Sequence, residues 1–62
     1  MASVESIQEA LRLLVAERQA LHERAAHHDE LESNRLELVR RQQELTQALI
    51  ARFRGRREAD AA

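Results

Sequence analysis

The 62-residue chain has no cysteine, no proline, one glycine and one aromatic residue, Phe53. The absence of cysteine excludes disulfides, thiol chemistry and zinc–thiolate sites. Because no proline interrupts the chain and Gly55 is its only glycine, helix is the one regular structure that the composition favours. A chain this short buries little surface and is marginal alone, so the sequence points to association with a partner chain as its source of stability.

Strong charge of one sign and long apolar runs are also absent. The formal net charge is −1, from 10 arginines and 11 acidic residues, which is not the basic balance of a dedicated nucleic-acid binder. No apolar run approaches the ~18–20 residues that span a bilayer. No signal peptide is readable at the N-terminus. We therefore expect a cytoplasmic protein with no membrane contact.

Two apolar stripes at helical spacing predict two helices. The positions of the first stripe are separated alternately by three and four residues, like the a and d positions of a heptad repeat. One of these positions, Arg18, is polar. The apolar members of this stripe are Val4, Ile7, Leu11, Leu14, Leu21 and Ala25. The second stripe has two polar intervening positions and consists of Leu31, Arg35, Leu38, Gln42, Leu45 and Leu49.

A flanking row widens the apolar arc of the second helix to roughly half its circumference. This row consists of Leu36, Val39, Ile50 and Phe53. An arc that wide is more than a single neighbouring helix covers. The second helix is therefore expected to contact two neighbours, as a helix in a bundle does.

The two stripes are out of phase, and the phase resets in the polar stretch 26–34. This predicts an all-α, antiparallel helical hairpin over residues 1–55, with helix 1 at about 3–26, a turn within 27–34 and helix 2 at about 30–54. Residues 56–62 are expected to form a frayed or helical tail. The alternative is one continuous helix of ~50 residues, ~75 Å long, because a heptad stammer can absorb the phase change.

Capping signals mark the ends of these helices. Ser3 is a suitable N-cap for helix 1. Capping boxes at Asp29 and Asn34, with Glu32 and Glu37 respectively, each offer a start for helix 2. Gly55 fits a C′ cap. With the turn within 27–34, the pairs expected to lie near each other are Leu21 with Arg35, Arg18 with Leu38, Leu14 with Gln42, Leu11 with Leu45 and Ile7 with Leu49.

An isolated hairpin would leave much of the second helix's apolar arc in water. Two hairpins packed together would cover it, so we expect a homodimeric four-helix bundle or an equivalent bundle with another protein. The residues expected at the oligomer interface are Ile7, Leu11, Leu14, Leu21, Leu38, Leu45, Leu49 and Phe53. Polar seam residues such as Arg18 are interpreted as fixing register, with an anion-binding recess as the alternative.

The function that this pattern favours is a non-enzymatic protein–protein interaction module that self-associates. No serine or threonine has the Asp–His partners of a nucleophile site. The spacing of His22, His27 and His28 puts no two imidazoles on one helical face, so no metal or cofactor is expected. The alternative is a small regulator that contacts nucleic-acid phosphates through the arginine cluster Arg52, Arg54, Arg56 and Arg57.

Parts of the chain resemble three known families. In length and plan the chain is similar to the Rop family of RNA-binding hairpins, and Gln43-Glu44-Leu45 and Ala51-Arg52-Phe53 resemble the end of that family's second helix; the resemblance implies a dimer of hairpins. Leu14-Val15-Ala16-Glu17 is similar to a stretch in small bacterial two-helix proteins of uncharacterised function. Residues 11–21 resemble the first helix of the all-helical chorismate mutases, which implies that Arg18 matches a pocket arginine.

Overall fold

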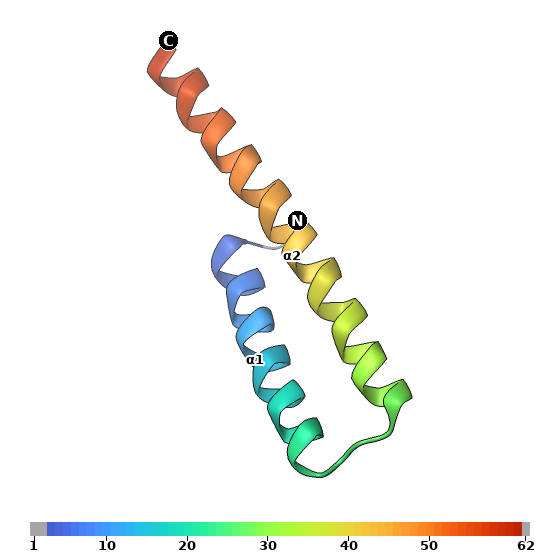
Figure 1. The fold of residues 1–62 in the computed structure, drawn as a ribbon. Helices are drawn as coiled ribbons and strands as arrows, with labels where there is room; N and C mark the ends of the chain where they lie inside the picture. Colours follow the sequence, from blue (N-terminus) through green and yellow to red (C-terminus); the bar gives the residue numbers. More distant parts are fainter. Residues whose placement is uncertain (1–2, 62) are drawn as a thin grey trace.

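The protein is a two-helix hairpin. The computed structural model describes residues 3–61, and the side chains of residues 3–56. Helix α1 (Val4–Glu23) and helix α2 (His28–Ala61) run antiparallel and pack along each other, which confirms the all-α hairpin over one continuous helix (Figure 1). No strand occurs in the described range. Because α2 has 34 residues and α1 has 20, the C-terminal part of α2 extends past the start of α1 (Figure 1).

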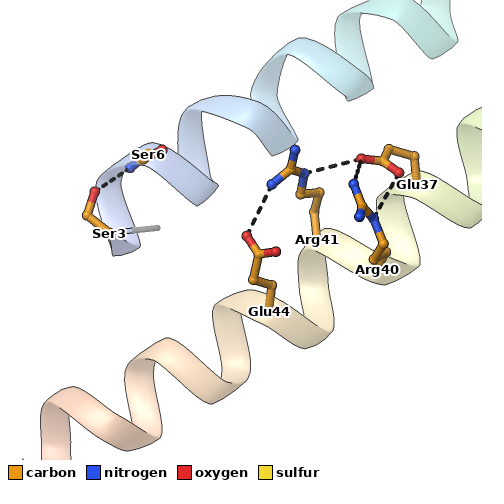
Figure 2. A network of polar contacts seen from close by, with 6 residues as sticks. All are labelled: Ser3, Ser6, Glu37, Arg40, Arg41 and Glu44. Carbon is orange, nitrogen blue, oxygen red and sulfur yellow. Dashed lines mark hydrogen bonds and ion pairs between the residues drawn. The ribbon is translucent and has the colours of Figure 1, made fainter. Parts of the chain in front are cut away.

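Helix α1 begins at the cap that the sequence indicates. Ser3 has extended backbone angles, and its Oγ accepts a hydrogen bond from the Ser6 N–H at 3.1 Å (Figure 2). Glu5 lies in the first turn, where the helix dipole favours an anion. The Ser3 hydroxyl thus satisfies one of the four free N–H groups at this helix end, that of Ser6.

Helix α1 ends three residues earlier than expected, in a turn without glycine. The Ala26 N–H donates to the Leu21 carbonyl at 2.9 Å, and the Ala25 N–H donates to the His22 carbonyl at 3.1 Å. These two bonds form a Schellman motif, whose C′ residue adopts left-handed backbone angles. That residue is Ala25, with φ of 51°. The expected turn within 27–34 is therefore wrong, apart from His27, because no glycine marks the true one.

Helix α2 begins two residues earlier than expected. The His27 carbonyl accepts the N–H groups of Glu30 and Leu31, and the Glu30 carboxylate accepts the His27 N–H at 3.3 Å. The bond from the His27 N–H to Glu30 is one of the two hydrogen bonds of a capping box, in which the N3 carboxylate accepts the N-cap N–H. Histidine occupies the N-cap position, where serine or threonine is usual. Glu30 also pairs with Arg24 across the turn at 3.1 Å. Neither expected capping box starts the helix, since α2 already begins at His28.

The other end of α2 also differs from the prediction. The helix passes through Gly55 and continues to Ala61, and no described glycine has a positive φ. The expected C′ cap at Gly55 and the expected end at residue 54 are wrong, and the described part of the 56–62 tail is helical; Ala62 lies outside the described residues. A glycine within a helix costs about 1 kcal/mol relative to alanine, and with no proline after it the helix can propagate.

The seam between the helices uses the predicted stripe of α1 and half of the predicted stripe of α2. Leu31, Leu38 and Leu45 lie in the seam as expected. The seam residue that follows each of these leucines is three positions further along the chain, not four as expected. The residues there are Asn34, Arg41 and Ala48, all buried or half-buried, whereas Arg35, Gln42 and Leu49 are exposed. The buried core is the cluster of Val4, Ile7 and Ala48, with Leu11 and Leu45 packed against it.

Near the loop the contacts differ from the expected pairs. Arg18 hydrogen-bonds to Asn34 and to the Leu31 carbonyl rather than lying opposite Leu38. The loop spans residues 24–27, earlier than the expected turn within 27–34, which changes the pairing at this end of the hairpin. At the other end Leu11 and Leu45 pack against one core cluster.

A polar layer crosses the seam near the loop end. Asn34 is 4% exposed, and its Nδ2 donates to the Leu14 carbonyl at 3.0 Å. Arg18 Nη1 donates to Asn34 Oδ1 at 3.2 Å and to the Leu31 carbonyl at 3.3 Å. These bonds can form in one alignment of the helices only, which supports the interpretation of Arg18 as a register-fixing residue.

A second polar position lies nearer the core. Arg41 extends from α2 beneath α1, between two carboxylates of its own helix (Figure 2). Its Nη1 lies 3.1 Å from Glu44 Oε1, and its Nε lies 3.3 Å from Glu37 Oε1 as an ion pair without hydrogen-bond alignment. Arg40 binds the same Glu37 carboxylate at 2.6 Å. A charged group is therefore accommodated at the seam by its neighbours one turn away on either side.

Candidate protein–protein interface

A row of mostly apolar side chains on α2 faces away from α1. We call it the outer row, and its positions are separated alternately by three and four residues. It consists of Leu36, Val39, Gln43, Thr46, Ile50 and Phe53. All six are exposed, and the four apolar members retain 39 to 60% of their accessible surface. This spacing is typical of a helix face that packs on another helix.

The outer row is distinct from the seam that contacts α1. At ~100° per residue the centre of the outer row lies roughly 140° around α2 from the centre of the seam. Leu49 lies between the two and is 45% exposed. The structure thus leaves α2 with one side against α1 and a second apolar side in solvent, as the width of its apolar arc predicts.

The exposed face continues onto the part of α2 that extends beyond α1. There Leu49, Arg52, Phe53 and Arg56 line a shallow hollow of about 170 Å³. Arg52 is held at the N-terminal end of α1, where its Nη2 pairs with Glu5 Oε1 at 3.0 Å. The hollow therefore lies next to the first turn of α1, and the α2 surface beyond that turn is not covered by α1.

The predicted interface residues divide into two groups. Ile7, Leu11, Leu14, Leu21, Leu38 and Leu45 lie in the seam of the single hairpin, two of them buried and four half-buried. Leu49 and Phe53 are exposed. The four half-buried leucines keep surface that a second hairpin can cover, so their role in oligomer contacts stays a prediction. The helical wheel identifies Leu36, Val39 and Ile50 as a flanking row but not as an oligomer interface.

The described arginines of the C-terminal cluster do not share a face. Arg52 and Arg56 are four residues apart on one side of α2, while Arg54 lies on roughly the opposite side at ~100° per residue. Arg52 is already paired with Glu5, and the side chain of Arg57 is outside the described residues. Phosphate contact through this cluster stays a prediction, to be tested by the steep salt dependence that such contacts produce.

A second hollow lies near the loop. This groove of about 600 Å³ is lined by Leu14 and Leu21 and by polar side chains that include Glu17, Asn34 and Glu37. No three of the described histidine and acidic side chains gather as metal ligands. Within that same range, no helix is long and apolar enough to cross a membrane.

Ion pairs within single helices cover much of the exterior. Glu9 with Arg12, Glu32 with Arg35, and Glu37 with Arg40 each approach to 2.6 Å. The hydrogen bonds from these arginines lower the pKa of each carboxyl from its ordinary value. Such pairs stabilise the surface of a helix modestly and are the usual solvated exterior.

Comparisons with known proteins give no relative. No family model, no curated protein and no solved structure matches the chain. Function must therefore be inferred from the side chains described above.

Proposed function

We propose that this chain is a non-enzymatic protein–protein interaction module that self-associates, two hairpins forming a homodimeric four-helix bundle. The observation that carries the proposal is the exposed apolar surface of α2. Among the described side chains, four apolar residues are buried, namely Val4, Ile7, Leu21 and Ala48. Within the same described range, seven large apolar residues are more than one-third exposed, and five of them lie on α2: Leu36, Val39, Leu49, Ile50 and Phe53.

The surface area of the hairpin supports the same proposal. The chain exposes 4985 Å² for a mass of 7.2 kDa. A compact monomer of that mass exposes about 4,100 Å². The excess is about 900 Å², close to the ~800 Å² that each partner buries in a standard protein–protein interface. One further hairpin is thus of the right size to cover it.

The test is the solution mass of the chain and of two matched variants. Size exclusion with light scattering and refractive-index detection suits a chain without tryptophan or tyrosine. Ile50→Glu places a carboxylate in the outer row, and Leu13→Glu places one at an equally exposed leucine of α1. The chain and Leu13→Glu are expected to elute as dimers, and Ile50→Glu as a helical monomer.

The size of the expected effect follows from symmetry. Each substitution occurs twice in a dimer, and each removes about half of the burial energy of an isoleucine, ~0.75–1.5 kcal/mol, so affinity should fall by about 10- to 150-fold. A monomeric mass for the unmodified chain at ~1 mM would refute the proposal, because association would then be weaker than about 4 kcal/mol.

A further inference from the structure

The outer row has a pattern that reads the same from both ends. Its six positions are apolar, apolar, polar, polar, apolar and apolar: Leu36, Val39, Gln43, Thr46, Ile50 and Phe53. In an antiparallel pair of identical helices centred on this row, Leu36 lies level with Phe53 of the other copy. Val39 then lies level with Ile50, and Gln43 with Thr46. Every layer joins apolar with apolar or polar with polar residues, and each contact occurs twice, as in an isologous two-fold interface.

From this symmetry we propose that the occupant of the outer row is the α2 helix of a second copy of this chain, packed antiparallel in the register that sets Leu36 opposite Phe53. This inference rests on the proposed function, self-association, and adds its geometry. The same register brings His28, the first residue of α2, level with Ala61, the last. Two α2 helices therefore overlap along their whole length, including the part that α1 leaves uncovered.

The distribution of charge favours this direction over a parallel one. Residues 49–57 carry four arginines and no acidic residue, whereas residues 17–37 carry six acidic residues and three arginines. A parallel pair sets the two arginine-rich ends side by side. The antiparallel pair separates the two arginine-rich ends and sets each of them level with the acidic loop end of the partner, which avoids the like-charge repulsion of the parallel pair.

The arrangement places four helices together at the centre of the dimer. Val4, at the start of α1, packs against Ala48, so the two α1 helices are level with each other only around residues 41–48 of α2. Leu49 lies next to this stretch, on α2 between the seam and the outer row. The order of helices there is α1, α2, then α2 and α1 of the second copy. The two arginine clusters lie at opposite ends of this dimer. Arg54 of one copy is level with Arg35 of the second copy. At 1.5 Å per residue, Arg35 and Arg54 of that second copy are about 28 Å apart along the helix.

Disulfide cross-linking tests the register, because the chain has no cysteine of its own. Two single-cysteine variants, Leu36→Cys and Phe53→Cys, are each made, and their reduced masses are measured first. They are then oxidised separately and as an equimolar mixture. Leu13→Cys, on the exposed side of α1, is the matched control. A disulfide needs Cα atoms within about 7 Å.

The expected result is a cross-linked dimer in the mixture and in neither variant alone. In the proposed register the two copies of position 36 are about 26 Å apart, too far for a disulfide. If the reduced variants are dimers and Leu36→Cys links to itself, the pair is parallel and the inference is overturned while self-association stands. Dimers that link in neither experiment also overturn it. Monomeric masses for the reduced variants and for the unmodified chain would overturn the inference and the proposed function together.

Discussion

The polar layer of Arg18 and Asn34 leads to the sharpest prediction on stability. Arg18 is half-buried, and Asn34 is 4% exposed. A hydrogen bond to a charged group contributes about 1.5–3 kcal/mol, and leaving a buried polar atom without a partner costs about 1–3 kcal/mol. Against a total stability of roughly 3–9 kcal/mol for a chain of this length, loss of this one contact is large.

The perturbation is a double-mutant cycle with Arg18→Met and Asn34→Leu. Arg18→Met leaves Asn34 Oδ1 buried without its donor, and Asn34→Leu leaves the guanidinium with the Leu31 carbonyl alone. The double variant removes both polar groups and replaces them with apolar volume, which is often neutral or stabilising. We expect a coupling energy of about 2 kcal/mol between the two positions, with the double variant more stable than either single one.

Urea unfolding followed by far-UV circular dichroism measures the effect. All variants are compared at one chain concentration, because the stability of a self-associating protein depends on it. The control cycle uses the exposed pair of Glu32 and Arg35, both changed to glutamine, where the coupling should not exceed about 0.5 kcal/mol. Additive effects at Arg18 and Asn34, within ~0.5 kcal/mol, would refute the argument that this layer stabilises the seam.

Three further predictions concern the turn, the tail and pH. Ala25→Gly should raise the free energy of unfolding by about 0.5–1 kcal/mol, because relief of the left-handed φ of 51° outweighs the added freedom of the unfolded chain, while Ala26→Gly, at a negative φ, should not stabilise. Gly55→Ala should increase the helical circular dichroism signal and stabilise by at most about 1 kcal/mol, since a Cβ there meets nothing within 4 Å; an unchanged or smaller signal would show that α2 does not continue through residue 55. Acid should destabilise the hairpin: the pKa of Glu5 is lowered from 4.5 by its own backbone N–H and by Arg52, so its stabilisation is present above that value and is lost as pH falls below it. Thermal unfolding at a series of pH values tests this, and equal midpoints at pH 6 and pH 3 would contradict it.

The candidate interface could be predicted in part from the sequence. The helical wheel gives Leu36, Val39, Ile50 and Phe53 as a second apolar row, because side chains three and four residues apart share a face whatever the tertiary structure. It does not give the position of that row relative to the two ends of α2. Both ends lack the usual signals: the turn has Ala25 in place of glycine, and the only glycine lies within a helix.

The sequence by itself determined the local structure of this protein. With no proline, one glycine and apolar residues at steps of three and four, two amphipathic helices, the Ser3 cap and the stripe of α1 follow from backbone chemistry and periodicity. Tertiary structure alone decided which side of α2 faces α1. The leucines at 31, 38 and 45 are compatible with steps of either three or four, and the four-residue loop at 24–27 selects the register in which Asn34 meets Arg18. That choice buries Ala48 and leaves Leu49 and the outer row exposed, because a helix rotated to bury one side must turn the other toward solvent.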